Sequence, residues 1–213
     1  MNATSEAPPP ASGAILAGGR GRRLGQDKTA IPWPPGGGAP AAGPEGTLLA
    51  HTAGTLAALC AEVLVVGYAG GRPLPGACRP VPDAFPAGGS LGGVYSALAG
   101  ARAEHVLVVA TDMPFLSQPL LRWMLAQPRD YDVLLPLGDR PQPLHAVWSR
   151  RCLDPLRRRL ESGRLRLTDV LADLRVRAVP AAVLAREDPR GRSFFNVNTP
   201  EDLRRARALW AEA

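Results

Sequence analysis

Short, continuous runs of apolar residues alternate along this chain with stretches in which apolar residues recur at helical spacing. The continuous runs are bounded by glycine or turn residues, as is typical of strands buried on both faces of a parallel sheet. They predict strands over residues 13–17, 63–66, 79–82, 106–110 and 133–135. Helical spacing predicts helices over residues 47–59, 94–101 and 117–127. Thr47 and Ser117 are suited to cap the first and third of these helices.

The pattern is looser in the last third of the chain. It predicts strands over residues 144–148, 175–179 and 194–198, and helices over 150–160 and 167–174. A final helix should begin after Thr199, because proline at the first helical position and acidic residues in the first turn are typical of helix starts.

This alternation of strands and helices predicts an α/β protein with a Rossmann-like, three-layer α/β/α fold and a mostly parallel sheet. The length of 213 residues and the lack of an internal repeat favour a single domain over residues 13–213. Residues 1–12 are rich in Ala, Pro and Ser and should form a disordered tail. Residues 32–46 hold five prolines and five glycines, which favours an insertion without regular structure over the alternative of a lid.

Composition narrows the classes of function. A hydrophobic fraction of 46% and a charged fraction of 21% are typical of a soluble globular protein. The net charge of +6 suits anionic ligands, but aromatic residues make up only 5% and do not alternate with basic ones as a single-strand binding surface requires. No apolar run reaches the ~20 residues of a membrane helix, and the first twelve residues do not resemble a signal peptide. We therefore expect a cytoplasmic protein that binds neither nucleic acid nor membranes.

A glycine-rich loop with several basic residues follows the first predicted strand and ends on Lys28, the only lysine among 25 basic residues. Backbone N–H groups of such a loop favour phosphates, and lysine is a compact charge suited to the same ligand. The alternative is a surface lysine without a role. The loop is not a Walker loop, because Asp27 precedes Lys28. It is not a dinucleotide fingerprint either, since Leu24 stands in place of the third glycine.

Two acidic residues follow other predicted strands, Asp83 after residues 79–82 and Asp112 after 106–110. Ligands of an open α/β sheet bind beyond the carboxyl ends of its strands, so both residues should lie beside the glycine loop. Asp112 is the candidate ligand for Mg2+, and its alternative role is a cap for the next helix. Asp83 is a candidate to share the metal or orient a ribose, with a plain turn as the alternative. The three histidines and three cysteines lack metal-ligand spacing.

These residues also resemble a known family. Leu16-Ala-Gly-Gly19 followed by Arg23-Leu-Gly-Gln-Asp-Lys28 is similar to the signature of the molybdenum cofactor guanylyltransferases, Leu-Ala-Gly-Gly and then Arg-Met-Gly-x-Asp-Lys. The resemblance continues through Asp83, Asp112-Met-Pro114 and Asn196-Val-Asn-Thr-Pro-Glu-Asp202, in the same order over nearly the whole chain. The first motif is shared by a broader group of nucleotidyltransferases, and the last one makes the narrower assignment.

Enzymes of that family join GMP from GTP to the phosphate of molybdopterin and release pyrophosphate. The resemblance implies a nucleotidyltransferase fold with a nucleotide-binding half over residues 13–115 and an acceptor-binding half over 116–213. It implies Mg2+ as the cofactor, GTP and molybdopterin as substrates, and transient contact with molybdoenzymes or their chaperones.

The resemblance also implies roles for single positions. The catalytic residues would be Lys28, which neutralises the triphosphate, Asp112, which binds Mg2+, and Arg23 near the phosphates. The nucleotide would be bound by Leu16, Ala17, Gly18, Gly19, Lys28, Asp83 and Asp112. Asn196 and Asn198 would face the pterin acceptor.

Three departures from the family pattern keep the choice of nucleotide open. Gly67 stands where relatives carry an asparagine that contacts the nucleotide, Ser90 stands where Gly-Pro-Leu is usual, and residues 32–46 are an unusual insertion. Cytidylyl transfer to the same cofactor, or another transfer from a nucleoside triphosphate to a phosphate, is the alternative reaction. The alternative outside enzymes is a nucleotide-binding regulator without catalysis, against which the intact Lys28 and Asp112 argue.

Overall fold

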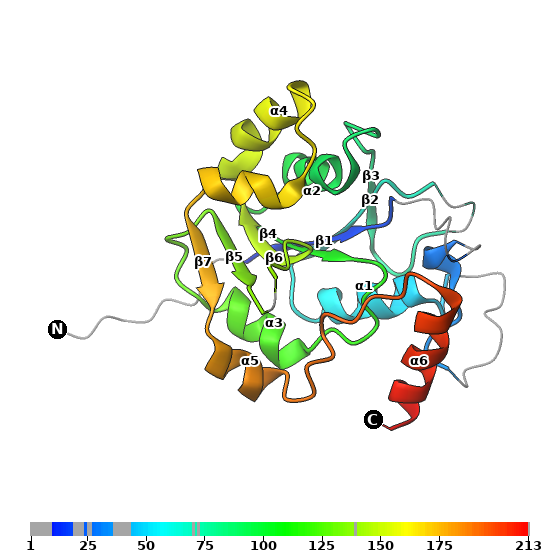
Figure 1. The fold of residues 1–213 in the computed structure, drawn as a ribbon. Coiled ribbons are helices and arrows are strands. Elements are labelled where there is room, and N and C mark those ends of the chain that lie inside the picture. Colours follow the sequence, from blue (N-terminus) through cyan, green and yellow to red (C-terminus); the bar gives the residue numbers. More distant parts are fainter. Residues whose placement is uncertain are drawn as a thin grey trace.

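The computed structural model describes residues 10–18, 24, 27–35, 44–69, 71, 73–138 and 140–212. These residues form a seven-stranded sheet with helices on both faces (Figure 1). Across the sheet the strands lie in the order β3-β2-β1-β4-β6-β5-β7. In chain order the strands are β1 (Ser12–Leu16), β2 (Glu62–Val66), β3 (Arg79–Val81), β4 (His105–Ala110), β5 (Val133–Pro136), β6 (His145–Ser149) and β7 (Val176–Val179).

The central strand β1 pairs in parallel with β2 and β4, and Ile15 lies opposite Val65 on one side and Val109 on the other. β3 continues the parallel arrangement beyond β2. β6 is the exception, because it runs antiparallel to both β4 and β5, while β5 and β7 are parallel again. The sheet is therefore mostly parallel, as predicted, and β1, β2, β3 and β4 end at a common edge.

Two layers of helices cover the sheet (Figure 1). The helices of one layer are α2 (Gly89–Gly100) and α4 (Leu153–Glu161), and those of the other are α1 (Leu48–Ala57), α3 (Gln118–Leu125) and α5 (Ala181–Glu187). Successive side chains of a strand point to opposite faces, so Ala14 packs in the core under α2 and α4 and Ile15 in the core under α1, α3 and α5. Burial on both faces explains why the strands are continuous apolar runs. The described residues also include three 3-10 helices, η1 (Lys28–Ala30), η2 (Arg150–Cys152) and η3 (Leu167–Asp173).

The last helix, α6 (Pro200–Ala211), begins as the sequence predicts. Thr199 is its N-cap, and the Thr199 hydroxyl accepts a hydrogen bond from the Asp202 amide while the Asp202 carboxylate accepts one from the Thr199 amide. Such a reciprocal capping box satisfies two backbone donors that a helix start otherwise leaves unpaired.

A third apolar cluster joins α6 to segments distant in the sequence. Trp33 is only 1% exposed and packs edge-to-face against Trp210 of α6, with ring centroids 5.3 Å apart. Phe115 packs against both tryptophans. Leu24 and Ile31, on either side of Lys28, belong to the same cluster. The cluster therefore holds the chain around Lys28 against the C-terminal helix.

The most informative difference from the predicted elements is the start of α2, at Gly89 instead of residue 94. Glycine disfavours helix, which is why Gly89–Gly93 resembles a turn in the sequence. Gly92 is needed because the helix passes close to the loop after β3 at this residue. A Cβ atom on Gly92 would lie 2.5 Å from the Phe85 carbonyl oxygen.

Two further predictions are wrong. Residues 194–198 form no strand, although all five are described. Their alternation arises because Val197 is buried in the cluster with α6 while its neighbours are more exposed, and one backbone hydrogen bond, from Val197 N to Asp112 O, joins the segment to the end of β4. The predicted tail over residues 1–12 is also too long, because Ala11 is buried and Ser12 is the first residue of β1.

Helix α5 was not predicted, and the predicted helix over residues 150–160 divides into η2 and α4. In the Pro- and Gly-rich stretch over 32–46, Pro32 forms an isolated antiparallel bridge with Thr47. Residues 36–43 lie outside the described part, so the choice between insertion and lid stays a prediction. Within the described ranges, no helix is long and apolar enough to cross a membrane.

Candidate active site

A cavity of about 280 Å3 lies at the edge of the sheet where β1, β2, β3 and β4 end. Every predicted site residue that the structure describes lines it, namely Leu16, Ala17, Gly18, Lys28, Asp83, Asp112, Asn196 and Asn198. Gly19 and Arg23 lie outside the described residues, so their roles stay predictions. The predicted convergence at the strand ends is therefore confirmed for the described positions.

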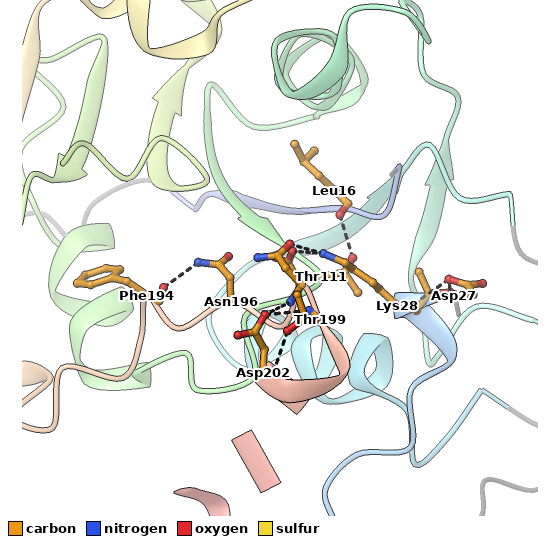
Figure 2. Close-up of polar contacts among 11 residues, drawn as sticks. Leu16, Asp27, Lys28, Thr111, Phe194, Asn196, Thr199 and Asp202 are labelled. Carbon is orange, nitrogen blue, oxygen red and sulfur yellow. Dashed lines mark hydrogen bonds and ion pairs between the residues drawn. The ribbon is translucent and has the colours of Figure 1, made fainter. Parts of the chain in front are cut away.

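Lys28 lies at the centre of the polar contacts in this cavity (Figure 2). Its ammonium donates hydrogen bonds to Asp112 Oδ2 over 2.6 Å and to Asn198 Oδ1 over 2.7 Å. The Lys28 and Asp112 side chains are 20% and 16% exposed, so their ion pair is largely screened from water. These contacts unite three segments that the sequence separates widely.

Asp27 fixes the backbone that carries Lys28. It is the N-cap of η1, and its Oδ1 accepts hydrogen bonds from the Thr29 amide and hydroxyl over 2.9 and 2.7 Å. The Thr29 side chain is buried beneath the turn. The Asp27-Lys28 pair thus combines a capping carboxylate with a projecting ammonium. This capping role of Asp27 was not predicted from the sequence.

Asp112 lies two residues after the end of β4, and one of its carboxylate oxygens has no hydrogen-bond partner among the described residues. Oδ2 accepts from Lys28, whereas Oδ1 is buried and has no hydrogen-bond partner in the described part of the chain. A buried carboxylate oxygen left in this state is costly, and a cation would satisfy it. The alternative role as a helix cap is excluded, because Ser117 caps α3.

No group of three or more His, Cys, Asp or Glu side chains that could hold a metal ion occurs among the described residues. An ion at Asp112 would therefore depend on ligand oxygens for most of its coordination shell. This suits Mg2+, which protein sites commonly hold through one or two carboxylates together with substrate phosphates.

Thr111 ties the ends of the two central strands together at the floor of the cavity. Its hydroxyl and its backbone amide both donate to the Leu16 carbonyl oxygen, over 2.9 and 3.3 Å (Figure 2). This cross-link fixes Asp112 relative to the start of the glycine loop. The sequence gives no separate signal for Thr111 apart from its position before Asp112.

Asp83 shapes the turn that leads from β3 into α2. Its Oδ1 accepts from the Phe85 amide over 3.0 Å and from the Ser96 hydroxyl over 3.2 Å. The role as a turn residue is therefore real, and Asp83 lines the cavity as well. Both interpretations of this residue are compatible with the geometry.

Gly67 brings the end of β2 close to the glycine loop. Its φ is 68°, in the left-handed region, and a Cβ atom there would lie 3.2 Å from Gly18 Cα. Asparagine also visits this region more readily than other residues with a side chain. The backbone of Gly67 is therefore one that an asparagine can adopt, with a small shift of Gly18.

The two asparagines of the C-terminal motif have different contacts. The Asn196 side-chain amide donates to the Phe194 carbonyl oxygen over 2.8 Å, whereas Asn198 accepts from Lys28 (Figure 2). Asp202 accepts hydrogen bonds from the Asn198 and Thr199 amides over 3.0 and 2.8 Å. The Asn198 bond above all, together with the Thr199 bonds and the charge of Lys28, lowers the pKa of the Asp202 carboxyl.

Several cavity residues were not predicted as site residues. They are Val66, Gly89, Ser90, Gly93, Ala110, Thr111 and Leu144. Gly89 and Ser90 matter most, because they form the N-terminus of α2, where unpaired amides and the helix dipole favour an anion. Ser90 was noted only as a departure from the family pattern. The helix predicted from the sequence begins at residue 94, so the prediction did not include this helix N-terminus.

The fold and the site together define the class of this protein as an α/β nucleotidyltransferase. The profile of the MobA-like NTP transferase domain matches residues 13–179. The chain belongs to this MobA-like family.

Relatives and solved structures agree with this assignment. The chain is 38% identical to a probable molybdenum cofactor guanylyltransferase of Pelotomaculum thermopropionicum over 93% of both chains. It is 33% identical to the molybdenum cofactor guanylyltransferase of Desulfosudis oleivorans, over 92% of this chain and 94% of that one. Its fold is similar to the crystal structure of molybdopterin-guanine dinucleotide biosynthesis protein A from Archaeoglobus fulgidus, with a TM-score of 0.75 and 26% identity over 95% of this chain and all of that one.

Proposed function

We propose that this protein transfers GMP from GTP to the phosphate of molybdopterin, forming molybdopterin guanine dinucleotide and releasing pyrophosphate. The observation that carries the proposal is the meeting of Lys28 and Asp112 in one cavity at the strand ends, with the second Asp112 oxygen buried and unpartnered among the described residues. The names of the relatives support the choice of GTP and molybdopterin.

The nucleotide would bind along the end of β1 and the start of α2. The short glycine-containing turn over Leu16–Gly18 lets a phosphate approach the backbone, and the N-terminus of α2 adds partial positive charge. Lys28 would neutralise charge on the triphosphate. Attack on an α-phosphorus needs alignment and charge stabilisation more than covalent catalysis, and these groups supply both.

Mg2+ is the metal that this site suits, with Asp112 as its protein ligand. The fit rests on Oδ1 of Asp112, which is buried and has no hydrogen-bond partner among the described residues. When bound, the ion would offset charge on the phosphates and on the leaving pyrophosphate. Lys28 would offset part of the negative charge of the same phosphate groups.

The acceptor would bind at the side of the cavity formed by the second half of the chain. Leu144, Asn196 and Asn198 line the cavity from that half. The leucine offers an apolar surface to a flat ring, and the Asn196 amide offers hydrogen bonds to its polar edge. The predicted contacts with molybdoenzymes or chaperones and the cytoplasmic location stay predictions from the sequence.

The test is pyrophosphate release from GTP, CTP, ATP and UTP, each measured with and without molybdopterin. We expect release from GTP only, and only when molybdopterin is present. A preference for CTP would show that the reaction is cytidylyl transfer and not guanylyl transfer. Binding of nucleotides without release in any combination would favour the regulator, and release with a sugar phosphate instead of molybdopterin would change the acceptor.

A further inference from the structure

We propose that Asn198 is a positioning residue for Lys28 and therefore serves nucleotide binding, in contrast to the role at the pterin that the family resemblance implies for it. The inference rests on the proposed function in one respect, namely that the cavity binds a nucleoside triphosphate. It goes beyond that function by assigning one residue of the C-terminal motif to nucleotide binding and not to binding of the pterin acceptor.

The direction of the hydrogen bond between Lys28 and Asn198 identifies the acceptor atom. An ammonium only donates, so the atom that accepts from it must be the amide oxygen of Asn198. The contact measures 2.7 Å, which is short for an N–H···O bond and typical of a charge-assisted one. Lys28 is thus held between two acceptors, the carboxylate of Asp112 and the carbonyl of Asn198.

Asn198 is itself held firmly enough to orient a flexible side chain. Its backbone amide donates over 3.0 Å to Oδ2 of Asp202, the acid of the α6 capping box. The preceding residue, Val197, is fully buried and donates its amide to the Asp112 carbonyl oxygen over 2.9 Å. The acceptor and the carboxylate that share Lys28 are therefore linked through the backbone as well.

This arrangement has a consequence for the free enzyme. A lysine side chain is a flexible chain of four carbons and lacks the planar fork of arginine, so nearby acceptors determine the position of its ammonium. With Asn198 present, the ammonium is drawn away from sole pairing with Asp112 and held at the cavity surface. Without the Asn198 oxygen, Lys28 retains Asp112 as its partner and loses the second anchor that aims it at a phosphate.

Asn196 provides a matched control. It lies two residues away in the same motif and lines the same cavity, but its side chain donates to the Phe194 carbonyl oxygen. Removing that side chain leaves both hydrogen bonds of the Lys28 ammonium in place. The two asparagines are thus the same residue type in the same motif, with and without a contact to Lys28.

The experiment measures equilibrium binding of GTP and of inorganic triphosphate to the free protein, without any acceptor. We expect Asn198→Ala to weaken both affinities about tenfold, which is ~1.4 kcal/mol. Asn196→Ala should leave both affinities unchanged while it lowers turnover with molybdopterin. Because Asn198 is exposed, its replacement should not affect folding, and thermal unfolding checks this.

A double-mutant cycle separates positioning from direct contact. If Asn198 acts through Lys28, Asn198→Ala causes no further loss of triphosphate affinity in a Lys28→Ala background. Full additivity would overturn the proposal. So would unchanged nucleotide affinity in Asn198→Ala together with a raised KM for molybdopterin, an outcome that leaves the proposed function standing. A wild-type protein that binds neither GTP nor triphosphate would overturn both.

Discussion

The ammonium of Lys28 lies 2.6 Å from a carboxylate oxygen of Asp112, although the two residues are 84 positions apart in the chain. One follows the glycine loop after β1 and the other follows β4. Each charge compensates the other in a partly buried position, where an unpaired charge would be costly. The pair therefore unites the two sides of the proposed nucleotide site.

Replacing either member of this pair should abolish transfer and leave the protein folded. Lys28→Ala and Asp112→Ala each remove a charge that the reaction needs, and we expect turnover to fall by at least roughly 10²-fold. Steady-state pyrophosphate release measures the effect, and thermal unfolding verifies the fold. Lys28→Arg keeps the charge but not the compact ammonium, so it should also lose activity. Near-normal turnover in either alanine variant would contradict the site assignment.

The same pair predicts that Lys28 competes with a metal ion. In the free protein its ammonium is paired with Oδ2 of Asp112, so its positive charge opposes a cation bound at Oδ1 of the same carboxylate. Lys28→Ala should therefore bind Mn2+, a spectroscopic substitute for Mg2+, more tightly than the wild type when no nucleotide is present. Electron paramagnetic resonance of free Mn2+ measures this affinity. Asn196→Ala should match the wild type, and equal or weaker binding in Lys28→Ala would show that the ammonium does not compete.

Two helical glycines should respond to alanine in opposite ways. In α2, a Cβ on Gly92 would lie 2.5 Å from the Phe85 carbonyl oxygen, so Gly92→Ala must displace either the helix or the loop that carries Asp83. Overpacking of this kind costs about 1–3 kcal/mol of the free energy of unfolding. In α1, nothing lies within 4 Å of a Cβ on Gly54, so Gly54→Ala should stabilise the protein by about 0.5–1 kcal/mol.

Urea unfolding at neutral pH tests both glycine variants under the same conditions. Gly92→Ala should in addition weaken GTP binding, because the displaced loop and the start of α2 line the cavity. A stabilising Gly92→Ala would mean that the backbone of the loop after β3 moves freely.

Buried His145 should make the protein sensitive to mild acid. Its side chain is fully buried, and burial lowers the pKa of the imidazole from 6.5 to about 4. Neither ring nitrogen has a hydrogen-bond partner within the described residues. Between these two pKa values His145 binds a proton in the unfolded chain but not in the folded one. Its contribution to the free energy of unfolding is therefore present in full above pH 6.5 and is lost as the pH falls from there toward about 4.

The measurement is the free energy of unfolding at pH 7 and pH 5, for the wild type and for His145→Phe. Between these pH values the wild type should lose on the order of 1–2 kcal/mol more than the variant, which is the contribution of His145 alone. His105, whose pKa burial also lowers to about 4, remains in both proteins and contributes equally to each. An identical pH dependence in the variant would show that His145 is not responsible.

Much of the fold could be predicted from periodicity, because hydrophobic pattern reports burial. The continuous apolar runs and the looser pattern of the last third together predicted all seven strands, each within one residue at its start and end, and caps such as Thr47 and Ser117 predicted helix starts. The pattern misled where burial had another cause. Residues 194–198 alternate because Val197 packs under α6, not because the segment pairs in a sheet.

The sequence by itself determined that a glycine loop, a lone lysine and two carboxylates would gather at the ends of parallel strands, since the α/β alternation allows few other arrangements. Only the tertiary structure decided the antiparallel direction of β6, the early start of α2 and the bond between Lys28 and Asn198, which are 170 positions apart. The hydrophobic pattern along a chain indicates which side chains are buried, but it does not indicate which residues distant in the sequence come into contact. Those contacts follow from the packing of whole elements, here α6 and the aromatic cluster around Trp33.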